Sequence, residues 1–476
     1  MRCITFYITE PSKKIPILTN TDVLVVGGGP AGLAAAIGAA REGVDVLLVE
    51  RYGFFGGNIT QSMVGTLSWY RYAKTIDAGG LIREFEDRAR KMNGTINVFD
   101  EKIISTEIGK FLKKKGVIVN GVPTYDILDT EVFKILADNM LQEAGVTPLL
   151  HCQAVDSIID GNTIIGIITE SKSGRQAIIA KRVIDATGDA DITFHAGAPF
   201  REAPKKDRMG VTVNFGYSGV DINKFLTFLL EKMQKSSNFI PYLKQSGELF
   251  FMDDFTNFIE PLNKIDNEET VPDDIPLSKI WKQYVELGII NSFNGIHMSN
   301  IDCTDVLDLT KAEIEGRSRI VKGIKFLTQR TPGFERARLK NIGSSLGTRE
   351  SRKIIGEYSI TEYEIKNQAR FEDSIGICPE FLDAYGIAIV PTTGRYFQIP
   401  YGIILPKKVE NLLVAGRCVA GDKMSHAATR QMVCCIVTGQ GAGVAAAVSI
   451  KENKTCRDVD ISKVQKALEN QGVRIK

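Results

Sequence analysis

Residues 22–50 read DVLVVGGGPAGLAAAIGAAREGVDVLLVE, and this stretch decides the fold. A short apolar run, Val23 to Val26, suits a buried parallel strand and enters GGGPAG at 27–32, which satisfies the pattern GxGxxG. An alanine-rich helix is expected from there to Glu42, followed by a second apolar strand, Val46 to Val49. Strand, glycine turn, helix and strand agree with one another, so the stretch predicts a βαβ unit that binds a dinucleotide.

The glycines and the acid of this unit have separate tasks. Gly27 permits the tight turn, Gly29 lets the backbone approach a pyrophosphate, and Gly32 allows close packing of helix on strand. The helix N-terminus offers N–H groups and a positive dipole end to phosphates. Glu50, 23 residues after Gly27, can bind the two ribose hydroxyls of an adenosine and would repel a 2′-phosphate. These residues alone do not choose between NAD and FAD.

The segment that follows favours FAD. An amphipathic helix is expected over 126–145 with Gly145 as its C-cap, and then a strand over 149–154. Further apolar runs at 164–169 and 176–180, separated by turn signals, read as a β-meander that leads to a strand at 182–185. A simple two-half nicotinamide dehydrogenase would have another helix in place of this meander.

The C-terminal part returns to the same architecture. A strand is expected over 412–415, followed by Gly416-Arg417 and by a long helix that carries Gly439, Gly441 and Gly443. Because no strand precedes these three glycines, they do not form a second dinucleotide fingerprint. They predict instead a helix whose backbone packs closely on another element or on a ligand.

At this point the chain resembles the FAD-dependent oxidoreductases of the glutathione-reductase-like flavin fold, similar to fumarate reductase flavoproteins. The motifs that carry the resemblance are DVLVVGGGPAGLAAA at 22–36, VERYGFFGGN at 49–58, VIDATGDAD at 183–191, PGFERARL at 332–339, GTRESRKIIGEY at 347–358 and LLVAGRCVAGDKMSHAATRQMVCCIVTGQGAGVAAA at 412–447. The middle of the chain, roughly 220 to 300, matches nothing that indicates a substrate.

The resemblance implies an α/β fold: a glutathione-reductase-like FAD-binding domain with a parallel sheet and a β-meander crossover, and an inserted α+β substrate domain. The expected limits are 1–199 and 396–476 for the FAD-binding domain and 200–395 for the substrate domain. It also implies non-covalent FAD, because residues 57–62 contain no His or Cys to attach a flavin. The implied FAD contacts are Gly27, Gly29, Ala31, Gly32, Glu50, Arg51, Gly56, Gly57, Asn58, Ala154, Gly188, Asp189, Gly416 and Arg417, of which Arg417 departs from an acidic residue in the relatives nearer to fumarate reductase.

Three residues are the catalytic candidates. His426 and Arg430 are four apart at the expected start of the glycine-rich helix, where they would share one face and could meet one ligand. A guanidinium binds a carboxylate through a fork of N–H donors, and a histidine can carry a proton near neutral pH. A structural network beside the flavin is the alternative. Arg349, in GTRESR, is a candidate for substrate or flavin binding, and the alternative there is a helix start salt-bridged to Glu350.

Composition sets the remaining limits. The 59 basic and 57 acidic residues give a net charge of +2, so no overall field favours nucleic acid or anionic lipid. We expect no membrane span, because the longest apolar stretch, 433–450, is interrupted by polar residues and glycines. The eight cysteines form no CxxC pair and indicate a reducing cytoplasm, and no cluster has metal-ligand spacing. A homo-oligomer is compatible with the sequence.

The function expected from these observations is hydride transfer between non-covalent FAD and a small organic substrate, perhaps one that carries a carboxylate or a carbonyl group. Two other enzyme classes stay open: a flavin monooxygenase fed by a reduced nicotinamide, and a redox-neutral hydratase or isomerase that needs reduced flavin. The non-enzyme alternative is an electron-transferring flavoprotein subunit, which the missing cysteine clusters disfavour. The electron donor or acceptor and the direction of the reaction are not identified by the sequence.

Overall fold

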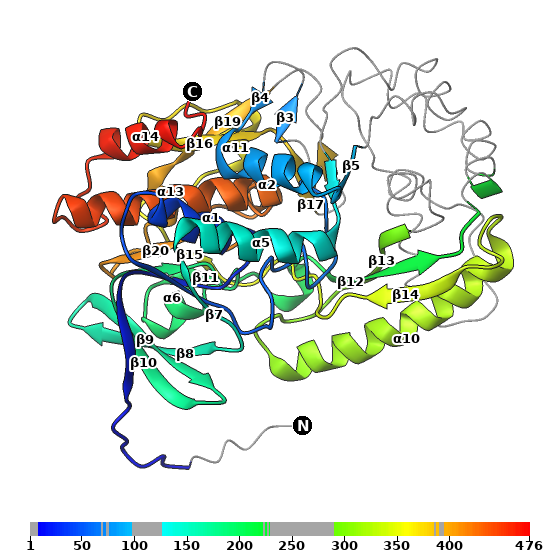
Figure 1. Ribbon diagram of the computed structural model, residues 1–476, viewed down its shortest axis with the longest axis horizontal. Coiled ribbons are helices and arrows are strands. Elements are labelled where there is room, and N and C mark those ends of the chain that lie inside the picture. Colours follow the sequence, from blue (N-terminus) through cyan, green and yellow to red (C-terminus); the bar gives the residue numbers. More distant parts are fainter. Residues whose placement is uncertain are drawn as a thin grey trace.

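A mostly parallel seven-stranded sheet forms the centre of the structure, a computed structural model that describes residues 8–67, 70–72, 76–97, 126–221, 224–225, 228, 290–384, 387–389 and 395–476 (Figure 1). The strand order is β7-β2-β1-β10-β9-β8, and β20 also pairs with β10. The strands are β1 (Ile17–Val26), β2 (Val46–Val49), β7 (Thr147–Leu149), β8 (Gln153–Asp160), β9 (Thr163–Ser171), β10 (Gly174–Asp185) and β20 (Leu412–Val414).

The long strand β10 joins the two parts of this sheet. Along one edge it pairs in parallel with β1 over its whole length. Along the other edge its first half pairs with the antiparallel β9, and its last residues, 183–185, pair in parallel with β20. The expected parallel sheet and β-meander are both present, and the C-terminal strand β20 completes the sheet begun by the N-terminal strands.

Both faces of the parallel strands are covered. Val23 and Val25 belong to the core that includes α1 (Pro30–Ala40), α5 (Thr130–Ala144) and α13 (Met432–Lys451). Leu24 and Val26, which point to the opposite face, pack in a second core with residues of the meander. Burial on both faces explains why β1 and β2 are continuous apolar runs.

Helices α1 and α13 cross at very short range. A Cβ on Gly439 would lie 2.1 Å from the carbonyl oxygen of Ala31, and one on Gly443 would lie 2.0 Å from that of Ala35. The glycine row therefore allows helix–helix contact, which confirms the close packing expected from the sequence. By length and composition α13 could cross a membrane, but 94 % of its apolar window is buried inside the protein, as in a core helix.

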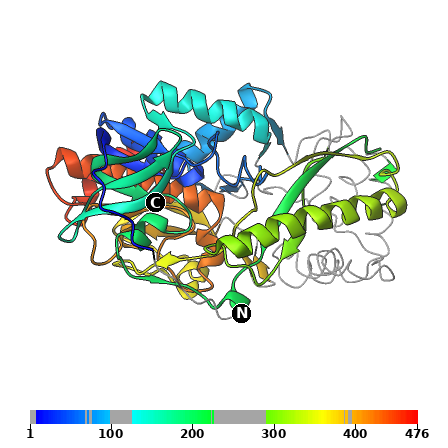
Figure 2. The same cartoon turned by 90° about the horizontal axis from the view of Figure 1, so that it is seen from below.

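A second lobe lies beside the central sheet (Figures 1 and 2). It contains a three-stranded antiparallel sheet, β13-β12-β14, and the long helix α10 (Val306–Arg330), which packs on β12 and β13. The strands are β12 (Val211–Ser218), β13 (Ile290–Met298) and β14 (Arg338–Ile342). The limits 200 and 395 for a substrate domain stay a prediction, although β16 (Ser374–Pro379) and β19 (Tyr396–Pro400) pair across the second limit.

The remaining elements are short or peripheral. They are α2 (Gly80–Lys91), α6 (Asp191–His195), α11 (Glu362–Lys366), α12 (His426–Thr429), α14 (Ile461–Asn470), the 3-10 turns Lys205–Asp207 and Tyr401–Ile404, and the strands β3 (Arg71–Tyr72), β4 (Ile76–Asp77), β5 (Thr95–Asn97), β6 (Asp126–Leu128), β11 (Phe200–Arg201), β15 (Lys353–Ile354), β17 (Leu382–Ala384) and β18 (Ile387–Ile389). The seven cysteines of the described residues are buried and free of disulfides.

Three boundaries differ from the sequence-based expectation. Helix α5 starts at Thr130 rather than at 126, because Asp129 caps it by accepting from the N–H groups of Glu131 and Val132. The expected strand 149–154 is two strands, since His151 between them has a φ of +53°. The runs 176–180 and 182–185 form one uninterrupted strand, β10.

Candidate functional site

The glycine turn after β1 separates glycines that the protein needs from one that it leaves free. Gly27 has a φ of +101°, and a Cβ there would lie 2.5 Å from the oxygen of Ala186. A Cβ on Gly32 would lie only 1.7 Å from the oxygen of Gly27. Around Gly29, by contrast, the nearest atom to such a Cβ is Gly57 Cα at 3.8 Å. The open space at Gly29 is not required by packing and fits the close approach of a pyrophosphate.

The start of helix α1 has the features of a phosphate site. Its N-cap is Gly29, no side chain of the described residues caps it, and Pro30 at the first helical position has no N–H to satisfy. The N–H groups of the first turn and the helix dipole therefore remain available to phosphate oxygens. With the open space at Gly29, this end of α1 fits the pyrophosphate of FAD.

Glu50 lies at the carboxyl end of β2 and is 5 % exposed. Its carboxylate accepts from the backbone N–H of Gly28 at 2.7 Å and from that of Tyr52 at 3.0 Å, one on each oxygen. An ionised carboxylate has about four acceptor sites, so two remain for ribose hydroxyls. The two backbone bonds fix the carboxylate beside the phosphate turn.

We expect Glu50→Gln to lower FAD affinity at least about tenfold, because a hydrogen bond to a charged group contributes about 1.5 to 3 kcal/mol. The amide NH₂ would also face one of the two backbone donors, at Gly28 or Tyr52. Equilibrium dialysis of the purified variant measures this loss. Unchanged FAD retention would exclude Glu50 as the ribose ligand.

The Gly-Gly segment lies directly against the phosphate turn. The N–H of Gly56 donates to the oxygen of Gly28 at 2.8 Å, and a Cβ on Gly57 would lie 2.8 Å from Gly29 Cα. Asn58 Nδ2 donates to the oxygen of Thr348 at 3.1 Å. The segment therefore connects the phosphate turn to the GTRESR motif, 290 residues further along the chain. Arg51 is exposed, with its guanidinium carbon 4.9 Å from the Tyr52 ring centroid.

The loops after β10 and β20 meet at an ion pair. Arg417 Nη2 donates to Asp189 Oδ1 at 3.0 Å, and the Ser351 hydroxyl donates to the same oxygen at 2.5 Å. Gly188 is needed here, since a Cβ on it would lie 2.6 Å from Arg417 Nη2. Gly416, with a φ of +90°, donates its N–H to Thr438 Oγ1 at 3.1 Å. The ends of parallel strands β1, β10 and β20 thus bring together the implied cofactor residues at one sheet edge, the usual position of a ligand in such a sheet.

Two further implied contacts lie at the edges of this region. Ala31 is buried in the first turn of α1, beside Gly439. Ala154 lies in β8, where it packs against the core formed by the meander. Whether these residues contact FAD stays a prediction.

The structure brings the three catalytic candidates together from distant parts of the chain. His426 Nε2 donates to the carbonyl oxygen of Arg349 at 3.0 Å. Arg349 Nη1 in turn donates to the oxygen of Gly210 at 3.0 Å and to His297 Nδ1 at 3.1 Å. Arg430 forms an ion pair with Asp383, Nη2 to Oδ2, at 3.1 Å. We call Arg349, His426, Arg430, His297 and Asp383 the cationic cluster.

His426 and Arg430 do not start the glycine-rich helix. They belong to the four-residue helix α12 and its C-cap, and the extended backbone of Gln431 (ψ 146°) separates them from α13. His426 is 1 % exposed. Burial, with the nearby charges of Lys353 and Arg430, lowers its pKa to about 3, so it is neutral at pH 7 and does not carry a proton there before a ligand binds.

The pKa of His426 predicts a pH-dependent stability. The folded value, about 3, is below the ordinary 6.5, so the unfolded chain binds more protons between these values. The contribution is complete above about pH 6.5 and is lost as the pH falls towards 3. Between pH 7 and pH 5 it amounts to about 2 kcal/mol. In denaturant titrations, His426→Gln should therefore lose about 2 kcal/mol less unfolding free energy than the wild type over this interval. Equal losses would contradict the prediction.

The segment that contains Arg349 is extended rather than the start of a helix. Glu350, fully buried, accepts from Lys353 Nζ at 3.0 Å and from the N–H of Met209 at 2.9 Å. Arg352 pairs with Asp191 at 2.8 Å and with Glu202 at 3.4 Å. The expected alternative, a helical salt bridge from these arginines to Glu350, is therefore wrong, since the acid is satisfied by a lysine and a backbone donor.

Arg349 is left as a cation without a carboxylate of its own. Burial and the neighbouring Arg430 lower its pKa to about 10, and among the described residues the acid acting on it is Asp383, which Arg430 already binds. It remains charged at neutral pH. Two guanidinium groups beside one carboxylate make this cluster suited to an anionic ligand.

His297 and Asp383 are the members of the cluster that sequence reasoning missed. His297 lies in β13 and Asp383 in β17, far from the other members along the chain. Neither carries a local motif. Only the pairing of β13 with β12, which places Thr212 opposite His297, brings that side chain to Arg349.

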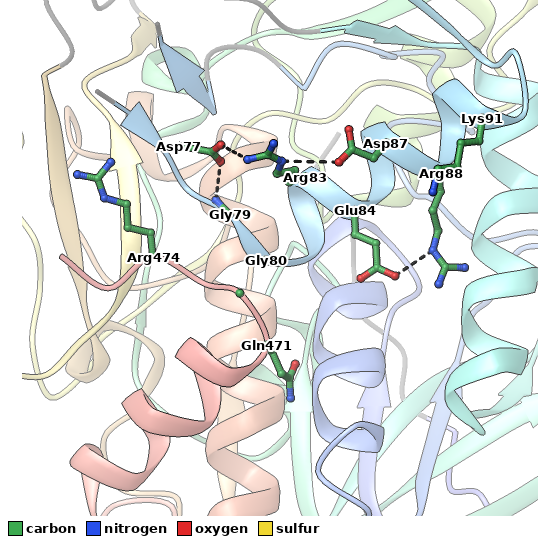
Figure 3. A pocket seen from close by; sticks show the side chains of 11 residues that line it. Asp77, Gly79, Gly80, Arg83, Glu84, Asp87, Arg88, Lys91, Gln471 and Arg474 are labelled. Carbon is green, nitrogen blue, oxygen red and sulfur yellow. Dashed lines mark hydrogen bonds and ion pairs between the residues drawn. The ribbon is translucent and has the colours of Figure 1, made fainter. Parts of the chain in front are cut away.

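A surface hollow of about 590 Å³ lies elsewhere, between the start of α2 and the C-terminal residues (Figure 3). Its side chains are mutually paired, as in Arg83 with Asp77 at 2.6 Å and Arg88 with Glu84 at 2.9 Å. It contains none of the candidate residues. Among the described residues, no group of three or more His, Cys, Asp or Glu side chains could hold a metal ion.

A parallel sheet, a glycine turn at a helix N-terminus and an acid after the second strand define a dinucleotide-binding α/β protein. A model of the family described as "FAD dependent oxidoreductase" matches residues 22–468. The chain therefore belongs to the FAD-dependent oxidoreductase family; it is an enzyme of that family, and its cofactor is FAD.

Similar proteins cover several reactions. Digeranylgeranylglycerophospholipid reductase 1 of Methanococcoides burtonii is 26 % identical over 43 % of this chain and 46 % of its own length. Thiamine thiazole synthase of Saccharolobus islandicus is 28 % identical over 39 % of this chain and 62 % of its own length. A geranylgeranyl bacteriochlorophyll reductase-like protein of Thermoplasma acidophilum aligns over 96 % of this chain and 85 % of its own, with a TM-score of 0.44 at 15 % identity. The chain spans about half the length of the curated relatives it matches, which do not determine its reaction.

Proposed function

We propose that this flavoenzyme transfers a hydride between non-covalent FAD and a small organic substrate that carries a carboxylate. In this proposal the flavin unit is glutathione-reductase-like, and the second lobe, within 200–395, covers the substrate. The observation that carries the proposal is Arg349, a cation that shares its nearest carboxylate with Arg430. A bound carboxylate would supply the missing counter-charge.

Each member of the cationic cluster has a distinct part in this proposal. Arg349 and Arg430 hold the substrate carboxylate. Because the carbonyl of Arg349 can only accept, His426 carries its proton on Nε2, which leaves Nδ1 as an acceptor. That Nδ1 is buried and has no hydrogen-bond partner among the described residues. A substrate hydroxyl would donate to it, and a nearby anion would raise the pKa of His426 so that it can take the proton.

Bound FAD supplies the hydride chemistry, and the residues of this chain position the substrate and handle the proton. The test is anaerobic mixing of the FAD-loaded protein with a panel of small hydroxycarboxylates and with their methyl esters. Loss of the visible flavin absorbance with the acids but not with the esters supports the proposal. Equal reduction by esters, or reduction by NADPH alone, would contradict it. The second result would favour a monooxygenase.

FAD is expected to leave the protein without bond cleavage. Residues 57–62, which lie beside the phosphate turn, contain neither His nor Cys. Acid or heat precipitation should release a yellow supernatant that contains one FAD per chain. A flavin that stays with the precipitated protein would show a covalent link.

A further inference from the structure

The outer face of helix α10 is apolar and unpaired with the rest of the fold. Its inner face, formed by Ala312, Gly316, Ile320, Gly323 and Leu327, is buried. On the opposite face, Leu307, Ile314 and Val321 repeat every seven residues and are 74 %, 61 % and 65 % exposed. In Figure 2 this helix lies at the front of its lobe, facing the viewer. A row of large aliphatic side chains held in water by a rigid helix marks an interaction surface.

Cations surround this row. Lys311 and Lys325 are exposed on the same side of the helix, by helical spacing, as the three aliphatic residues. From residue 316 to residue 340 the chain has eight basic residues and one acid, Glu335, although the whole protein has a net charge of only +2. The basic residues are Arg317, Arg319, Lys322, Lys325, Arg330, Arg336, Arg338 and Lys340. The positive charge of the molecule is thus concentrated on α10 and on the strand that follows it, β14.

We propose that the outer face of α10 docks this enzyme on an anionic phospholipid surface. The aliphatic row enters the boundary between headgroups and acyl chains, and the lysine stems follow it while their charges meet lipid phosphates. A second copy of the chain fits less well, because it would bring the same cations against Lys311 and Lys325. Nucleic acid fits the charge but not the aliphatic row.

The test is co-sedimentation of the FAD-loaded full chain with phosphatidylcholine vesicles that contain or lack phosphatidylglycerol. Binding is expected only with the anionic lipid and should weaken as salt is raised. The triple variant Leu307→Gln, Ile314→Gln, Val321→Gln and the double variant Lys311→Glu, Lys325→Glu should each bind about tenfold or more weakly. All five positions are exposed, so FAD content and melting temperature should stay at the wild-type values.

Matched controls are Ile135→Gln, an exposed aliphatic on α5, and Lys172→Glu, an exposed lysine in the turn between β9 and β10. Both should bind vesicles like the wild type. The proposal is overturned if the wild type does not bind anionic vesicles, or if the triple variant binds them as well as the wild type. It is also overturned if the wild type is a dimer in solution that the triple variant dissociates, since the face would then be an interface between copies. None of these outcomes depends on the identity of the substrate.

Discussion

Alanine at position 29 is expected to leave the protein folded but unable to retain FAD, whereas alanine at position 32 is expected to disrupt the fold. At Gly29 the nearest atom to a new Cβ is 3.8 Å away, and its φ of −72° suits any residue. The methyl group would stand where a pyrophosphate approaches and would cost one or two charged hydrogen bonds, about 10²-fold in affinity. At Gly32 the new Cβ would lie 1.7 Å from a backbone oxygen, which cannot move without separating α1 from β1.

Circular dichroism and FAD titration distinguish the two variants. Gly29→Ala should keep the wild-type spectrum and apoprotein stability while losing the cofactor, and Gly32→Ala should be poorly folded with or without FAD. Gly43→Ala is a suitable control, because nothing lies within 4 Å of its Cβ position and only its φ of +77° is strained, at a cost of about 1 kcal/mol. Normal FAD affinity in Gly29→Ala would show that the phosphates bind elsewhere.

Replacing Arg349 by glutamine is expected to slow flavin reduction by the carboxylate substrate about 10²-fold or more while FAD stays bound. The charge removed is the one that the protein does not neutralise, so the substrate loses its principal anchor. For the same reason the melting temperature should be unchanged or higher, since removing a buried cation with a shared partner relieves a cost of folding. Loss of rate with retained or increased stability is the signature of a binding residue.

Arg349→Lys separates charge from geometry, because lysine keeps the charge and removes the planar fork. If the fork matters, this variant should recover only part of the rate, mainly through KM. Arg370→Gln, a surface arginine that donates to the oxygen of Tyr396, serves as the matched control and should turn over normally. A large loss of stability or of FAD in Arg349→Gln would instead assign Arg349 to the structural network around the flavin.

The N-terminal unit was predictable because its signals are local. β1, the glycine turn, α1, β2 and Glu50 follow one another within 34 residues, from Ile17 to Glu50, and each has its own sequence signature. The β-meander and the closely packed helix α13 were predictable for the same reason, from turn residues and from a row of glycines. The implied cofactor residues, by contrast, come from loops far apart in the chain, and their contacts with FAD remain to be tested.

The errors arose where tertiary contacts decide the backbone. His151 adopts a left-handed conformation between β7 and β8, and its N–H donates to the oxygen of Tyr52 in another loop. Gln431 breaks the helix between α12 and α13 without a glycine or proline to signal it. The cationic cluster depends on a strand pairing and on a buried lysine, Lys353, that satisfies the acid beside Arg349. None of these contacts has a periodic pattern in the sequence.

The crossing of α1 and α13 also affects how the protein is made. Ribosomes release the chain from its N-terminus, so α1 and β1 emerge some 400 residues before the helix and the strand that cover them. Until then the apolar face of the early sheet has no partner, and loop closure over such a length makes folding slow. We expect the nascent chain to depend on chaperones for this interval, and a chain that stops before Leu412 to be degraded rather than to accumulate as a partial flavoprotein.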